Sequence, residues 1–187
     1  VVHVSRHLNA DTVLVMGAGP IGLFCQQAMQ VLRGSKVYVA DLSNERLEVA
    51  KKLGAVRVIN PRDEDVVAVM KEATGGEGAD LSVDAVGSGI TKRTAVDAIR
   101  PGGGSVWIGL HEDEMTFNSY GLTLPEKQVF GSYAATIDEL QHALNLMSEG
   151  KVDAESWVQR FSLEDGVEAF QRMLAAKGND IKAVVCP

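Results

Sequence analysis

One glycine pattern, set between a short apolar run and a longer amphipathic run, restricts the possible folds of this chain more than any other feature. The apolar run covers residues 12–16, and the glycines follow as Gly17-x-Gly19-x-x-Gly22. A short run that is almost entirely apolar predicts a parallel strand covered on both faces. The amphipathic run over residues 23–32 predicts a helix that follows the turn. A strand, a glycine turn and a helix in this order are typical of βαβ folds.

The alternation of short apolar and amphipathic runs continues along the chain. Strands are expected over residues 36–41, 57–59, 81–86, 105–110 and 128–132, and helices over 46–53, 64–73, 91–99 and 137–148. The helix over residues 91–99 is expected to be broken at the Pro101-Gly102-Gly103-Gly104 stretch, before the fifth strand. Strands separated by helices of this length predict right-handed βαβ units. We therefore predict the α/β class, with a doubly wound parallel six-stranded sheet of the Rossmann type.

The pattern changes after Gly150. A possible strand over residues 157–161 is followed by an amphipathic helix over 163–176 and a last apolar strand over 181–186. This strand–helix–strand tail need not extend the parallel sheet. We therefore expect a nucleotide-binding domain over residues 1–133 and a separate C-terminal segment over residues 134–187.

Each glycine of the pattern has a distinct expected role. Gly17 allows the tight turn, Gly19 lets the backbone approach a pyrophosphate, and Gly22 lets the helix pack on the strand. Pro20 and Ile21 lie in the same turn, and the helix that follows it has N-terminal N–H groups and a partial positive charge that favour phosphate. The motif therefore predicts a dinucleotide site, and the alternative is a plain strand–helix turn.

Asp41 ends the second predicted strand, about 20 residues past the glycines. A carboxylate there accepts both hydroxyls of the adenosine ribose and repels a 2′-phosphate, so it favours NAD over NADP. The alternative is a solvent-facing aspartate at a strand end. Arg46 lies over the adenine face in one interpretation and is an ordinary surface arginine in the other.

Two further strand ends are candidates, because ligands of open α/β sheets bind beyond the carboxyl ends of strands. Val86 and Gly87 follow the fourth strand and would form a wall of the adenosine site. Ile108, Gly109 and Leu110 end the fifth strand and would reach the nicotinamide. A buried strand end with a glycine turn explains each of these stretches equally well.

The amino-acid composition argues against several classes of function. The 187 residues carry a formal net charge of −7, which argues against a nucleic-acid partner and against an anionic membrane surface. Cys25 and Cys186 are the two cysteines, and they are far apart, so we expect a reduced cytoplasmic protein without a cysteine zinc site. The chain opens on Val1 rather than on methionine, so we expect a fragment of a longer protein.

Several motifs together resemble one known group, the zinc-type alcohol, sorbitol and threonine dehydrogenases of the medium-chain dehydrogenase/reductase superfamily. The matching motifs are VLVMGAGPIG (13–22), DLSNERL (41–47), AKKLGA (50–55), DAVG (84–87), RPGG (100–103) and GSY (131–133). The tail also looks like that group at residues 160–164 and 169–170. The resemblance covers nearly the whole chain and corresponds to the C-terminal, NAD-binding half of these enzymes.

The resemblance implies roles for individual residues. Val86 would line the adenine pocket, and the backbone of Ile108, Ser132 and Ala134 would hold the nicotinamide carboxamide. Lys182 would approach the pyrophosphate from the tail. Residues 134–187 would pack on an N-terminal catalytic domain that is absent from this chain.

The resemblance also implies what this chain does not supply. In this family the zinc ligands and the proton relay come from the N-terminal domain, and zinc there polarises the alcohol oxygen. His3, His7, His111 and His142 have no metal-ligand spacing, so we assign no catalytic and no metal-binding residue. The implied function is the NAD(H)-binding domain of an oxidoreductase that moves hydride between a primary or secondary alcohol or polyol and NAD. The isolated chain is expected to bind cofactor without turnover.

Two alternative functions are considered beside the dehydrogenase, and a homodimer is expected. A non-catalytic Rossmann nucleotide-binding or sensor module would show the same glycine turn. A methyltransferase that binds S-adenosylmethionine is less favoured by the glycine spacing with Pro20. A homodimer is expected through the edge strand from Gln128 to Ser132, because exposed edges invite pairing and the family joins two sheets there.

Overall fold

The computed structural model describes residues 1–175 and 180–187, and its main feature is a parallel sheet of six strands. The strand order is β3-β2-β1-β4-β5-β6, and every neighbouring pair is parallel. The strands are β1 (Thr12–Met16), β2 (Lys36–Ala40), β3 (Arg57–Ile59), β4 (Ala79–Asp84), β5 (Ile99–Trp107) and β6 (Gln128–Gly131). The order reverses at β1, which confirms the doubly wound α/β fold predicted from the sequence.

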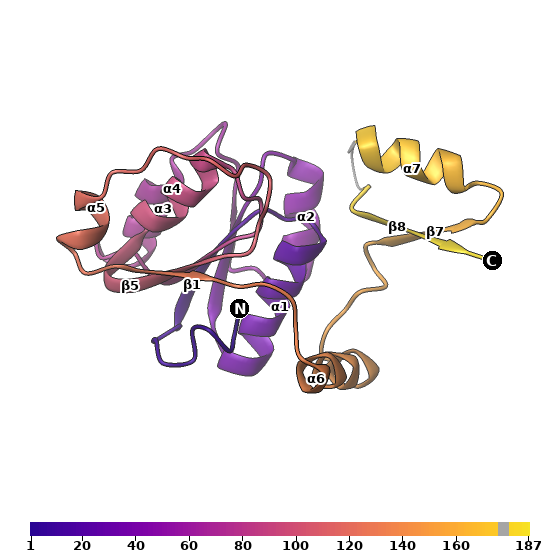
Figure 1. The fold of residues 1–187 in the computed structure, drawn as a ribbon, viewed down its shortest axis with the longest axis horizontal. Helices are drawn as coiled ribbons and strands as arrows, with labels where there is room; N and C mark the ends of the chain where they lie inside the picture. Colours follow the sequence, from indigo (N-terminus) through magenta and orange to yellow (C-terminus); the bar gives the residue numbers. More distant parts are fainter. Residues whose placement is uncertain (176–179) are drawn as a thin grey trace.

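Helices cover both faces of this sheet, as Figure 1 shows. Those connecting the strands are α1 (Pro20–Arg33), α2 (Asn44–Lys52), α3 (Val66–Ala73), α4 (Gly89–Asp97) and the short α5 (Tyr120–Thr123). Val13 and Val15 of β1 belong to a core with α1 and α2, whereas Leu14 belongs to a core with α3 and α4. Alternate residues of one strand point to opposite faces, so an almost wholly apolar run is what a strand in this position requires.

The predicted helix over residues 91–99 ends at Asp97, before the Pro101 to Gly104 stretch, and β5 runs through that stretch from Ile99 to Trp107. The pairing with β4 shifts register between Ala79 and Leu81, so the irregular residues lie at a bulge inside the strand. A Cβ on Gly104 would lie 2.3 Å from Leu8 Cδ1, so the Leu8 side chain packs directly against this glycine. The expected strand over 105–110 therefore begins earlier and ends at Trp107.

Smaller differences concern the ends of elements. The loop over residues 111–126 contains α5, which the sequence did not indicate. Gly34 ends α1 with φ +67°, and Gly54 follows the end of α2 with φ +92°. Both angles lie in the left-handed region that favours glycine. Asp41 lies one residue beyond β2, and Val86 lies two residues beyond β4. Both are thus in the loops at the carboxyl edge of the sheet.

The C-terminal part forms α6 (Ile137–Ser148) and then the expected strand–helix–strand tail. In the tail, β7 (Val158–Ser162) and β8 (Lys182–Cys186) pair in parallel as a separate sheet, with α7 (Gly166–Ala175) between them in the chain. The expected last helical residue, Ala176, lies outside the described residues. No helix in residues 1–175 and 180–187 has the length and apolar character needed to cross a membrane.

The tail contacts the main sheet through α1. The Trp157 ring packs edge-on against Phe24, with ring centroids 5.1 Å apart. The Gln27 side chain accepts from the Asp153 N–H at 2.6 Å and donates to the Asp153 carbonyl at 2.9 Å. Figure 1 shows α7, β7 and β8 beside α2 rather than on the six-stranded sheet.

Candidate nucleotide-binding site

The glycine turn joins β1 to α1 at the carboxyl edge of the sheet. Gly17 has φ +99°, and its N–H donates to the Ala40 carbonyl of the neighbouring strand at 2.7 Å. A Cβ on Gly22 would lie 1.8 Å from the Gly17 carbonyl oxygen, so only glycine allows α1 to start so close to the turn. A Cβ on Gly19 would meet nothing within 4 Å, so the turn leaves open space at this position.

The N-terminus of α1 keeps its backbone donors available. The helix begins at Pro20 with Gly19 as N-cap, and no side chain of the described residues caps it. The first N–H groups of a helix need acceptors from outside the helix. Such an end is suited to bind the phosphates of a nucleotide, and the open space at Gly19 fits a pyrophosphate against the backbone.

The Asp41 carboxylate links this turn to the next helix. Oδ2 accepts the Ala18 N–H at 2.7 Å, and Oδ1 accepts the Ser43 N–H at 2.8 Å. Ser43 in turn caps α2. These bonds fix the carboxylate at the carboxyl edge of the sheet, and each oxygen keeps a second lone pair for a ligand hydroxyl.

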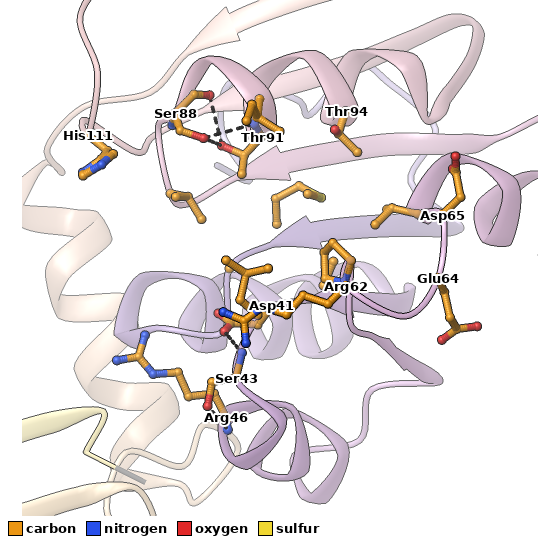
Figure 2. A pocket seen from close by; sticks show the side chains of 18 of the residues that line it. Asp41, Ser43, Arg46, Arg62, Glu64, Asp65, Ser88, Thr91, Thr94 and His111 are labelled. Carbon is orange, nitrogen blue, oxygen red and sulfur yellow. Dashed lines mark hydrogen bonds between the residues drawn. The ribbon is translucent and has the colours of Figure 1, made fainter. Parts of the chain in front are cut away.

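A cleft of about 1100 Å³, the first cleft, lies at this edge beside Asp41 (Figure 2). It brings together four of the predicted site residues, namely Gly17, Asp41, Arg46 and Val86. Five carboxylates and two guanidinium groups line it: Asp41, Glu45, Glu64, Asp65, Glu112, Arg46 and Arg62. The excess of carboxylates makes the cleft unfavourable for an additional phosphate.

Gly87 and Gly109 serve close packing between two strand ends and do not line the cleft. A Cβ on Gly87, at φ +92°, would lie 2.2 Å from the Gly109 carbonyl carbon, and one on Gly109 would lie 2.3 Å from the Gly87 nitrogen. Asp84 holds both ends. Its carboxylate accepts from the N–H groups of Val86 and Gly87, and its carbonyl accepts from Ile108 and Gly109.

A second cleft of about 680 Å³ lies on the other side of the glycine turn, between α1 and α6. It brings together another four predicted residues, namely Ile21, Ile108, Ser132 and Ala134. Ala134 has φ +57°, which is uncommon for a residue with a Cβ. An extended ligand that crossed the α1 N-terminus would therefore reach both groups of predicted residues.

In the described part of the chain, seven predicted residues are absent from the lining of both clefts, namely Gly19, Pro20, Gly22, Gly87, Gly109, Leu110 and Lys182. Leu110 is exposed after β5. Lys182 is exposed at the start of β8. The residues described include no group of three or more His, Cys, Asp or Glu side chains arranged to hold a metal.

Sequence reasoning missed the loop after β3, which contributes Pro61 and Arg62 to the first cleft. Buried Asn60 holds this loop: its amide donates to Asn44 Oδ1 at 2.7 Å, and its Oδ1 accepts the Arg62 N–H at 3.0 Å. An Asn-Pro pair directly after a predicted strand is a turn signal and could have indicated the loop.

Cys25 provides a test of the packing beside the second cleft. Burial raises the pKa of the Cys25 thiol to about 11, so the reactive thiolate is scarce at pH 8. We expect iodoacetamide at pH 8 to modify the less buried Cys186 and to leave Cys25 unmodified in the folded chain. Peptide mass spectrometry measures both sites, and unfolding in urea should make both reactive. Rapid labelling of Cys25 without denaturant would contradict this packing.

The sheet order, the glycine turn and the carboxyl-edge clefts define a Rossmann-type α/β fold. Residues 20–149 match the family model described as zinc-binding dehydrogenase. The chain therefore belongs to the zinc-binding dehydrogenase family, as its motifs indicated.

Similar proteins support this assignment. D-xylulose reductase A of Aspergillus oryzae is 32% identical over 185 residues, which covers 95% of this chain and 52% of that protein. The structure of an alcohol dehydrogenase from Thermus sp. ATN1 has a TM-score of 0.88 at 28% identity and covers 100% of this chain and 54% of that one. An alcohol dehydrogenase from E. coli CFT073, complexed with NADH, has a TM-score of 0.83 at 28% identity and covers 99% and 54%. The chain spans about half the length of the relatives it matches.

Proposed function

We propose that this chain is the NAD(H)-binding half of a zinc-dependent oxidoreductase that acts on alcohols or polyols. The proposal rests mainly on the position of the Asp41 carboxylate. Two backbone N–H groups hold it between the glycine turn and the first cleft. Family membership and the NADH complex of one similar dehydrogenase support the same conclusion.

The first cleft would take the adenosine half of the cofactor. Asp41 would accept the ribose hydroxyls, and Val86 would contact the adenine, with Arg46 at the start of α2 nearby. The N–H groups at the start of α1 would bind the pyrophosphate, which the open backbone at Gly19 admits. The carboxylates of the cleft favour NAD over NADP, because a 2′-phosphate would add negative charge among them.

The second cleft would hold the nicotinamide half. Ile21 and Ile108 would contact the ring and exclude water, and backbone groups at Ser132 and Ala134 would orient the carboxamide. When bound, NAD supplies the carbon that accepts hydride from the alcohol. This chain would contribute position and electrostatics to that transfer, and no residue of it is assigned a catalytic role.

The remaining parts of the reaction are placed outside this chain. Zinc and the substrate pocket are proposed to belong to a second domain, against which residues 134–187 would pack. Exposed apolar side chains on α6 and α7, among them Ile137, Leu140 and Phe170, are consistent with such a covering. A homodimer through β6 is also proposed, because β6 is an edge strand of the sheet.

Fluorescence titration with NADH and NADPH tests the cofactor proposal directly. We expect saturable binding of NADH that is at least about tenfold tighter than that of NADPH, because one unfavourable phosphate–carboxylate interaction costs about 1.4 kcal/mol or more. Equal or tighter binding of NADPH would contradict the assigned role of Asp41. Absence of binding to either nucleotide would count against a nucleotide site altogether.

A further inference from the structure

Arg62 is held at the first cleft by its backbone. Asn60 is buried, and besides accepting the Arg62 N–H its amide donates to Asn44 Oδ1 and to the Leu42 carbonyl. The loop after β3 is thereby fastened to the loop that carries Asp41. Figure 2 shows the Arg62 side chain extending from this loop toward Asp41, at the cleft wall opposite α4.

The carboxylates around Arg62 are already engaged. Glu64 pairs with Arg57, Asp65 accepts the Ala68 N–H at 2.9 Å as the N-cap of α3, and Asp41 accepts two backbone N–H groups. Among the described residues, no ion pair of Arg62 is found. An arginine anchored at a cleft without a protein partner is available to a ligand.

The opposite wall is partly apolar. Val86 and Ile90 line it with exposed fractions of 38% and 69%, and Thr91 and Thr94 lie there on α4 (Figure 2). Exposed apolar side chains on one wall and a planar cation on the other form a slot suited to a flat aromatic group. The slot lies beside Asp41, where the ribose of the proposed cofactor would be bound.

We propose that Arg62 covers the adenine of the bound dinucleotide, with its guanidinium flat on one face of the base and Val86 and Ile90 against the other. Arg62 is then a determinant of specificity for adenine nucleotides. This inference rests on the proposed function, because it requires the adenosine half to occupy the first cleft.

Titrations of NADH, NADPH and ADP-ribose against Arg62 variants test the inference. We expect Arg62→Ala to weaken all three ligands by about three- to tenfold, the range of a stacked cation–π contact. Arg62→Tyr, which keeps a flat stacking surface without charge, should recover more affinity than Arg62→Lys, which keeps the charge without the plane. Arg160→Ala is the control, since Arg160 pairs with Glu155 outside both clefts and should leave binding unchanged.

The possible outcomes separate this inference from the proposed function. Wild-type affinity in Arg62→Ala, or recovery by lysine alone, would overturn the stacking role. A loss confined to NADPH would assign Arg62 to a 2′-phosphate and would also overturn it. A wild-type chain that binds none of the three ligands would overturn the proposed function, and this inference with it.

Discussion

Replacement of Gly22 with alanine should lower the free energy of unfolding by at least about 3 kcal/mol, the upper end of the usual cost of overpacking. The added Cβ would lie 1.8 Å from the Gly17 carbonyl oxygen and 2.8 Å from its carbon. Both are backbone atoms, and Gly17 is bonded through its N–H to Ala40, so the clash cannot be relieved by a side-chain rotation. Urea denaturation followed by circular dichroism measures the loss.

Gly19→Ala is the matched control for this prediction. The Gly19 backbone is not in the left-handed region, and a Cβ there meets nothing within 4 Å, so stability should stay within about 0.5 kcal/mol of wild type. The methyl group would, however, fill the space proposed for the pyrophosphate, and NADH affinity should fall about tenfold or more. Equal stability of the two variants would disprove the packing role of Gly22, and unchanged NADH binding in Gly19→Ala would disprove the pyrophosphate site.

Asp41→Asn should weaken NADH binding by about ten- to a hundredfold, the worth of a hydrogen bond to a charged group. The carboxylate accepts N–H groups on both of its oxygens. In an asparagine one of these positions becomes an NH2 group, which would face the Ala18 or the Ser43 N–H donor to donor. The variant would thus lose a ribose acceptor and part of the tether of the glycine turn.

NADPH binding should change less in Asp41→Asn, because the removed charge also repels the 2′-phosphate. The preference for NADH should therefore fall by about tenfold. Asp153→Asn is a suitable control, since Asp153 accepts two backbone N–H groups outside both clefts and should leave both affinities unchanged. A preference that survives in Asp41→Asn would show that another group discriminates between the two cofactors.

The sheet could be predicted because its signals are local. The apolar strand at 12–16 and the glycine turn each depend on neighbouring residues. The course of β5 could not be predicted, because it depends on a register shift against β4 and on the packing of Leu8 against Gly104. That contact joins residues 96 positions apart in the sequence (104 minus 8).

The candidate site was predictable to a similar degree. The glycine motif and Asp41 are recognised from spacing alone, and the structure places both at the carboxyl edge of the sheet. Arg62 was missed because its position depends on hydrogen bonds of Asn60 to a loop 16 or more residues earlier in the chain. Gly87 was expected in a wall of the adenosine site and Gly109 near the nicotinamide, whereas the contact between them became visible only when two distant strand ends were brought together.

The contact between Gly87 and Gly109 couples the shapes of the two clefts. Val86 borders the first cleft and Ile108 the second, and the glycines that follow them lie backbone against backbone over Asp84. A substitution at Gly87 that reshaped one cleft would displace Gly109 and alter the other. We therefore expect substitutions at the two positions to have non-additive effects, so a redesign of this fold for a different nucleotide should change them together.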